Sequence, residues 1–194
     1  MSAALTLKAL GCIRGDRVLF TGLDLSLEPG GAALVTGPNG AGKTSLLRLI
    51  AGLLSAHAGE VSMSGTMAFL AEQSALDREL PLKKALGYWA RLDRREPARI
   101  DVALEAMALD ALADVPVRML STGQLKRAAL ARIILAGADI WLLDEPANGL
   151  DTDSRARLES AIASHRARGG IALVATHQPL DLPDAVPVTI GEAA

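Results

Sequence analysis

The most constrained chemistry in this sequence lies in a glycine-rich stretch, residues 37–44, that fits the pattern G-x-x-x-x-G-K-[ST]. Glycines let the backbone approach phosphate groups, and the amide N–H groups of a helix start supply positive potential. Lys43 would bridge the outer phosphates of a nucleotide, and Thr44 would ligate Mg²⁺. The predicted nucleotide-binding residues are Gly37, Pro38, Asn39, Gly40, Ala41, Gly42, Lys43, Thr44 and Ser45.

Two adjacent carboxylates, Asp144 and Glu145, follow an apolar run at residues 140–143. If this run is a strand beside the one that leads into the phosphate loop, Asp144 can hold Mg²⁺ directly or through water. Glu145 can then polarise a water molecule in line with the γ-phosphate. Such a pair is common at strand ends, but after a phosphate loop it indicates hydrolysis of a nucleoside triphosphate.

A second phosphate-binding surface is predicted at residues 120–124. Ser121 offers a hydroxyl and Gly123 a backbone N–H at the start of an expected helix, and Gln124 follows them. One nucleotide site does not need two such surfaces in the same chain, so two copies must meet around each nucleotide. A plain helix cap would explain Ser121, but not the Gly-Gln pair or its position ahead of the acidic strand.

The elements that position these residues alternate between buried strands and helices with apolar residues at three- and four-residue spacing. This pattern predicts an α/β fold, with a mostly parallel sheet covered by helices on both faces and an antiparallel N-terminal β portion. The expected strands are 5–10, 18–27, 32–36, 61–63, 66–70, 140–143 and 171–175, and the expected helices are 43–51, 82–92, 99–107, 124–135 and 153–167.

Residues 74–116 differ from the rest of the chain in their sequence pattern, because they show helical spacing and many basic residues and contain no strand pattern. We expect them to form a small helical subdomain inserted into a single domain that spans residues 1–194. Their basic side chains are Lys83, Lys84, Arg91, Arg94, Arg95 and Arg99.

Composition excludes several classes of partner and compartment. A net charge of −2 gives no general attraction to nucleic acid or to an acidic membrane surface. The single cysteine, Cys12, indicates a reducing compartment, and no signal peptide or membrane-spanning run is expected. The mean hydropathy of +0.28 reflects either an Ala- and Leu-rich core or an exposed apolar patch for a partner.

Taken in order, these motifs resemble those of the ATP-binding subunits of ABC transporters over nearly the whole chain. The resemblance implies the ABC ATPase core of the P-loop NTPases and roles for three further residues. Gln73 is similar to the glutamine that senses Mg²⁺ and water and links the core to the helical subdomain. Asp151 resembles the aspartate that reaches across the dimer, and His177 resembles the switch histidine that contacts the γ-phosphate.

Two positions depart from the family pattern. Thr122 replaces a glycine, so its φ must suit a β-branched residue; the contacts from Ser121 and Gly123 do not need its side chain, and activity should survive. Arg14 stands where the family stacks an aromatic ring on adenine. Because a planar guanidinium can also stack on a base, Arg14 is either a base contact or a solvated surface residue.

The family resemblance implies hydrolysis of ATP with Mg²⁺ in a head-to-tail homodimer. ATP would lie between the phosphate loop of one copy and Ser121, Gly123 and Gln124 of the other. Charge on the transferring phosphoryl group would be stabilised by the side chains and the metal, while a carboxylate orients the attacking water. The expected catalytic residues are Lys43, Gln73, Glu145 and His177, and the expected metal ligands are Thr44, Gln73 and Asp144.

Residues 169–180 and 85–92, together with the small size, resemble the ATPases of cytochrome c maturation, a haem exporter family. This implies a peripheral subunit on the cytoplasmic face of the inner membrane, bound to integral membrane subunits. No Cys-x-x-Cys-His motif is present, so no haem site is expected in this chain. The basic insert is the expected docking surface, with Tyr88 and Trp89 as apolar anchors.

Two other classes of ABC ATPase remain open. One is an importer or multidrug ATPase with a different cargo, and such an importer would co-purify with a periplasmic solute-binding protein. The other is a soluble assembly factor without a membrane partner, which would stay in the soluble fraction.

Overall fold

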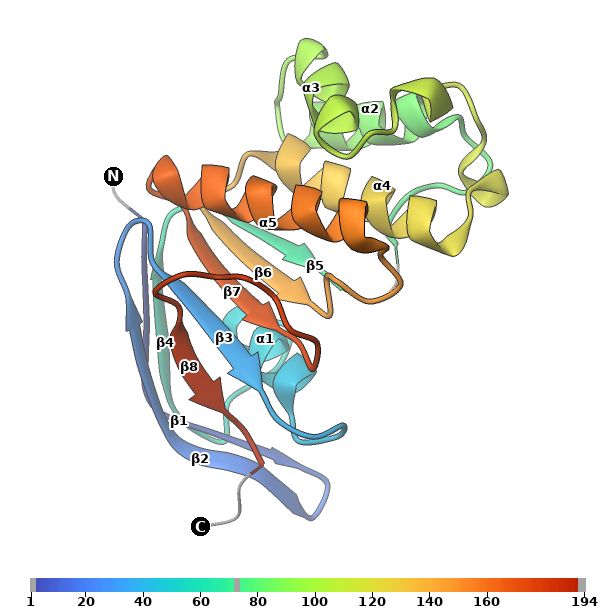
Figure 1. Ribbon diagram of the computed structural model, residues 1–194. Helices are drawn as coiled ribbons and strands as arrows, with labels where there is room; N and C mark the ends of the chain where they lie inside the picture. Colours follow the sequence, from blue (N-terminus) through green and yellow to red (C-terminus); the bar gives the residue numbers. More distant parts are fainter. Residues whose placement is uncertain (1–2, 72–73, 192–194) are drawn as a thin grey trace.

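The computed structural model describes residues 3–71 and 74–191, and it arranges them as two sheets with helices around them (Figure 1). The larger sheet has the strand order β5-β6-β7-β3-β8, and every neighbouring pair in it is parallel. Its strands are β3 (Ala32–Thr36), β5 (Met67–Leu70), β6 (Ile140–Asp144), β7 (Ile171–Ala175) and β8 (Val186–Thr189). The predicted α/β fold with a mostly parallel sheet is therefore confirmed.

The strand β8 is absent from the sequence-based expectation. It is a four-residue edge strand that contains Pro187, and among the described residues it pairs with β3 alone. A proline in a short run argues against a strand, although it is tolerated at a sheet edge. This edge matters for the site, because the backbone N–H of Ile190, just after β8, donates to Thr36 O at the end of β3.

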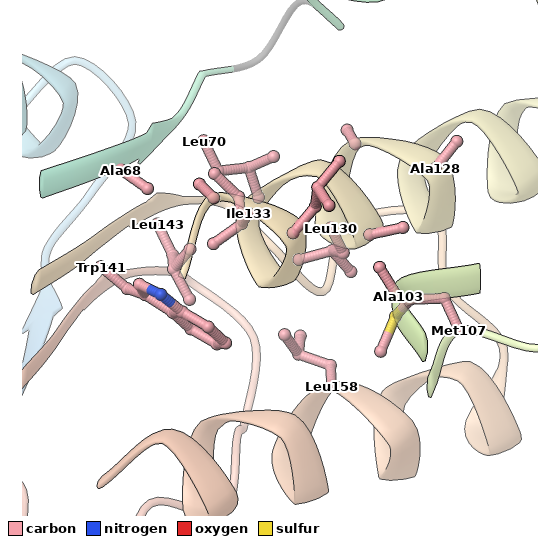
Figure 2. Close-up of a cluster of buried hydrophobic side chains, with 14 of the residues drawn as sticks. Ala68, Leu70, Ala103, Met107, Ala128, Leu130, Ile133, Trp141, Leu143 and Leu158 are labelled. Carbon is pink, nitrogen blue, oxygen red and sulfur yellow. The ribbon is translucent and has the colours of Figure 1, made fainter. Parts of the chain in front are cut away.

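Each face of the central strands belongs to a different core. Along β6, Trp141 and Leu143 pack into the core shared with the larger helices, whereas Ile140 and Leu142 pack into the core on the opposite face. Figure 2 shows Trp141 and Leu143 directed toward side chains of the helices. Because successive side chains on a strand point to opposite faces, a continuous apolar run is what a strand buried on both faces requires.

The smaller sheet is antiparallel, with the order β2-β1-β4. Its strands β1 (Ala4–Arg14), β2 (Arg17–Leu27) and β4 (Ala58–Ser64) are longer than the predicted runs. The pairing of β1 shifts register between Leu7 and Leu10, where Ala9 has a φ of 46° and its N–H bonds the Asp24 carboxylate at 2.8 Å. This irregularity interrupts the alternation and explains why the sequence pattern ends early.

Three helices flank the central sheet. The helix α1 (Lys43–Ile50) contributes Leu46 and Leu47 to the core between the two sheets. On the other face lie α4 (Thr122–Ala136) and α5 (Thr152–Ala167), which supply Leu130 and Leu158 to the second core (Figures 1 and 2). All three agree with the predicted helices to within about two residues at each end, which is the usual uncertainty of helix boundaries.

Between β5 and α4, the described residues form helices and turns without a strand. The helices are α2 (Leu82–Leu92) and α3 (Ala98–Ala106), followed by the 3-10 turns η1 (Asp110–Leu112) and η2 (Val117–Met119). Arginines satisfy the carbonyl groups that helix ends leave open. Arg95 donates to Ala136 O at 2.8 Å at the end of α4, and Arg127 donates to Met107 O at 2.8 Å at the end of α3. That this segment is a separate subdomain stays a prediction.

Candidate nucleotide site

The phosphate loop connects β3 to α1, and two of its glycines have conformations that a side chain would not allow. Gly37 has a φ of 146°, and a Cβ atom there would collide with the carbonyl oxygen of Ile190. Gly42 has a φ of 115° and occupies the N-cap of α1, where no side chain caps the helix. The first N–H groups of α1 are therefore left for a ligand, as an anion-binding helix start requires.

Lys43 is held inside this loop. Its side chain is 8% exposed, and Nζ donates to Gly37 O at 2.8 Å and to Pro38 O at 3.2 Å. The same Nζ lies 4.0 Å from Oε1 of Glu145. A buried ammonium group needs hydrogen-bond acceptors and a counter-charge, and these three groups supply them in the absence of phosphate.

Glu145 and His177 meet at the ends of neighbouring strands. Oε2 of Glu145 lies 2.9 Å from His177 Nδ1, and the backbone N–H of Glu145 donates to Ala175 O at 2.8 Å. Glu145 has a φ of 46°, in the left-handed region that a glutamate rarely adopts. Strained backbone of this kind is concentrated at functional sites, and here it turns the carboxylate toward Lys43 and His177.

Asp144 is positioned to hold a cation. It is only 4% exposed, and its Oδ1 has no hydrogen-bond partner among the described residues. Burial raises the pKa of Asp144, and the neighbouring Thr44 hydroxyl opposes this shift. A buried carboxylate oxygen without a partner, beside a hydroxyl, is the kind of oxygen donor set that Mg²⁺ prefers.

Lys43, Thr44, Asp144 and Glu145 line one cleft of about 700 Å³, whereas His177, which contacts Glu145, is not among the lining residues. The cleft also receives residues that the sequence did not point to, Leu19 from β2 and Lys126 from α4. Neither side chain belongs to a local motif, although Lys126 lies two residues after the segment 120–124. The lining consists of Leu19, Asn39, Gly40, Gly42, Lys43, Thr44, Ser45, Ser74, Thr122, Leu125, Lys126, Ala129, Asp144, Glu145, Asn148 and Gly149.

The signature segment, defined here as Ser121–Gln124, is the capped start of α4. Ser121 Oγ accepts from the Gln124 N–H at 3.3 Å, and Gln124 Oε1 accepts from the Ser121 N–H at 2.8 Å. Thr122 is the first residue of the helix and has a negative φ, so the expectation about its backbone is confirmed. Ser121 is exposed and, unlike Thr122, does not line the chain's own cleft.

Three further predicted residues lie apart from the cleft lining or outside the description. Asp151 is exposed and caps α5, accepting from the Ser154 N–H at 2.8 Å. Hydrogen bonds from the Ser154 side chain and then from its backbone lower the pKa of Asp151. Arg14 is exposed at the end of β1 and is not among the residues that line the cleft. Gln73 lies outside the described residues. Contact of Arg14 with a base therefore remains a prediction, as do the roles of Gln73 and Asp151.

Trp89 is not free to act as a surface anchor. It is half-buried, its indole N–H donates to Ala75 O at 2.9 Å, and the Arg132 guanidinium stacks 4.8 Å from its ring centroid. Arg132 Nη2 in turn donates to Phe69 O at 2.6 Å. Burial lowers the pKa of Arg132. Trp89 thus joins α2 to the segment after β5, and Tyr88, which is 55% exposed, is the residue of the pair that faces solvent.

Comparison with known proteins identifies the family. The ABC transporter family model matches residues 20–148. The chain is 54% identical to the Cytochrome c biogenesis ATP-binding export protein CcmA of Sphingopyxis alaskensis over 194 residues, 100% of each chain. The protein of that name from Zymomonas mobilis is 53% identical over 94% of this chain and 82% of its own length. An ABC transporter ATP-binding protein structure from Pyrococcus furiosus matches with a TM-score of 0.84 and 26% identity over 96% of each chain. The chain therefore belongs to the ABC transporter family and, within it, to the cytochrome c biogenesis ATP-binding export proteins.

Proposed function

We propose that this protein is the ATP-hydrolysing subunit of a membrane exporter complex that handles haem for the biogenesis of c-type cytochromes. The observation that carries the ATPase part is that Glu145 contacts both Lys43 and His177 beside an uncapped helix start. The export part rests on the printed names of the relatives, which are ATP-binding export proteins for cytochrome c biogenesis.

Asp144 and Thr44 are the residues of the described cleft that would hold Mg²⁺. The unpartnered Oδ1 of Asp144 supports this, because a buried carboxylate oxygen gains a partner when a cation binds. A cation held there would supply positive charge against that of a bound nucleotide's phosphate groups.

The side chains of the cleft would act on the γ-phosphate of ATP. Lys43 is held by loop carbonyls with its ammonium group toward Glu145, so it can move its bonds from these acceptors to phosphate oxygens. Glu145 would release His177 and accept a hydrogen bond from the attacking water. His177, once released, can donate to the γ-phosphate.

A second copy would complete the site. The signature segment is a helix start whose exposed serine, Ser121, is not among the residues that line the chain's own cleft. In a head-to-tail dimer, the hydroxyl of Ser121 and the N–H of Gly123 would meet the γ-phosphate bound to the partner. Asp151, at the start of α5, would reach the same interface.

The membrane partners would bind the helical segment on the cytoplasmic face of the inner membrane. Tyr88 and Leu92 are 55% and 58% exposed and lie one turn apart on α2, which gives the segment an apolar surface. Within the described residues, no helix has both the length and the apolarity needed to span a membrane. We propose attachment through integral subunits because the relatives are named as ATP-binding export proteins.

The variant Glu145→Gln tests the ATPase assignment. It keeps the size of the side chain but removes its charge and replaces one acceptor oxygen by an NH2 donor, so the side chain polarises water less and hydrolysis should fall at least about a hundredfold, on the order of 3 kcal/mol. ATP should still bind and should trap a dimer, as seen by phosphate release and light scattering. Glu105→Gln, an exposed glutamate on α3, is the control and should keep full activity. Undiminished hydrolysis by Glu145→Gln would reject the proposal.

The export role needs a separate test. We expect a pull-down in gentle detergent from native membranes to recover integral haem-handling subunits with this chain. Recovery of a periplasmic solute-binding protein would point to an importer instead. Residence of the chain in the soluble fraction at native expression level would point to an assembly factor.

A further inference from the structure

Gln178, the residue after His177, connects two elements of the site through its side-chain amide. Its Nε2 donates to Asn148 Oδ1 at 3.2 Å, and its Oε1 accepts from Arg155 Nη2 at 3.0 Å. A guanidinium can only donate, so the oxygen of the amide must face Arg155 and the nitrogen must face Asn148. Both ends of the amide are therefore used, one on α5 and one on the loop after β6.

The backbone of Gln178 is fixed as firmly as its side chain. Its N–H donates to Thr176 Oγ1 at 3.0 Å, and the same hydroxyl donates to Gln178 O at 3.3 Å. Thr176 is 1% exposed, at the end of β7. His177 lies between these two residues in the chain, so a shift of the Gln178 backbone would move the histidine as well.

Asn148 extends this connection toward the signature segment. It lines the nucleotide cleft, and its N–H bonds Glu145 O at 3.3 Å. The carbonyl oxygen of the next residue, Gly149, would lie 3.3 Å from a Cβ atom at Gly123, so the loop packs closely against the start of α4. A displacement of the signature segment would therefore move the loop that contains Asn148 and Gly149.

Arg155 depends on its hydrogen bond with Gln178, so loss of the Gln178 side chain would also affect Arg155. Its Nε is buried and has no partner among the described residues, so the bond to Gln178 is one of the few that repay the desolvation of this guanidinium. Removal of the Gln178 oxygen would release Arg155 and the amide together.

We infer that Gln178 is a positioning residue that ties the loop of His177 to the loop of Asn148, and so to the signature segment of the same chain. The inference rests on the proposed ATPase function. In the dimer, the signature segment serves the nucleotide bound to the partner, whereas His177 serves the chain's own nucleotide. Gln178 thus couples the two ATP sites of the dimer.

The test compares Gln178→Leu with wild type in the complex that the chain forms with its membrane subunits. We expect kcat to fall about tenfold with KM changed less than twofold, because the groups that bind ATP remain in place. The wild type should hydrolyse ATP cooperatively, and Gln178→Leu should bring the Hill coefficient to about 1. Thr66→Val is the matched control, since it removes a hydroxyl that bonds Asp139 at 2.8 Å, away from the cleft lining.

Variants of Asn148 separate coupling from a general loss of stability. Asn148→Ala removes the bond between Asn148 and Gln178 that Gln178→Leu also removes, so it should lower kcat and cooperativity as well. The double variant should be no worse than Gln178→Leu, because that variant has already lost this bond. Asn148→Asp keeps an acceptor for Gln178 Nε2 and should retain cooperativity. Additive losses, or a Gln178→Leu variant equal to Thr66→Val, would overturn the inference alone. A wild type without ATPase activity, or a Lys43→Ala variant as active as wild type, would overturn the proposed function with it.

Discussion

Two helix starts in this chain are suited to phosphate, and they are built in opposite ways. The helix α1 begins after Gly42, which has a left-handed backbone and provides no capping side chain. The helix α4 begins after Ser121, and a capping box with Gln124 satisfies the N–H groups of Ser121 and Gln124 from within the chain. No side chain caps the first start, whereas side chains of the same copy cap the second.

The difference indicates separate roles for the two starts. Lys43 is buried at the first start and supported by loop carbonyls, so this start is a site formed in advance of ATP. Ser121 is exposed at the second start, and its hydroxyl, which accepts from Gln124, still has a proton to donate. A capped helix can therefore fold first and offer one donor to another molecule later.

The variant Lys43→Ala tests the first helix start and has the largest expected effect. Loss of the ammonium group removes a preorganised charge from the γ-phosphate, so kcat/KM should fall by more than about a hundredfold. Lys8→Ala is the control, because Lys8 is an exposed lysine on β1. Urea unfolding should be measured beside phosphate release, since Gly37 O and Pro38 O lose a donor. Activity equal to wild type would remove the phosphate loop from the mechanism.

Ser121→Asp tests the second start and separates capping from phosphate binding. Aspartate caps helices as well as serine and suits the positive end of the helix dipole, so the midpoint of urea unfolding should not fall. The added negative charge would face the partner's γ-phosphate, and hydrolysis should fall about ten- to a hundredfold. A variant that stays fully active would mean that Ser121 acts only as a cap.

A mixture of the two variants shows whether the starts act in different copies. A dimer of Lys43→Ala with Ser121→Asp has one site with both defects and one site with none. Equal amounts should therefore recover up to about a quarter of the wild-type activity, which is more than either variant alone is expected to keep. No recovery above the average of the separate variants would mean that the two starts of each site come from the same copy.

Much of the fold was predictable because its strands are buried on both faces and its loops are locally encoded. Local requirements explain these residue types: a strand buried on both faces needs the apolar run 140–143, and a positive φ favours glycine at positions 37 and 42. The family resemblance then ordered the site, and the structure brings Lys43, Glu145 and His177 together as that order implies.

The parts that could not be predicted depend on contacts between distant residues. The strand β8 forms by pairing with the edge of β3, a contact between distant parts of the chain. Its proline lowers the strand propensity of the segment, so the local sequence does not predict a strand there. The sequence alone suggests that Trp89 is an exposed aromatic residue, because its contacts with Ala75 and Arg132 form only in the folded structure. Gln178 meets Asn148 across 30 positions of sequence, a pairing that no local pattern encodes.

The smallest expected effect sharpens the comparison at Thr122, the residue between Ser121 and Gly123. Thr122 already has a helical φ that threonine adopts without strain, so the site does not need a glycine at this position. Thr122→Gly should therefore lower the free energy of unfolding by up to about 0.5 kcal/mol, because glycine is a poorer helix former. Hydrolysis should stay within about twofold of wild type, because Ser121 and the Gly123 N–H carry the phosphate contact. Urea unfolding and phosphate release measure the two quantities. A fall beyond tenfold would show that the Thr122 side chain, which lines the chain's own cleft, acts on the nucleotide bound there.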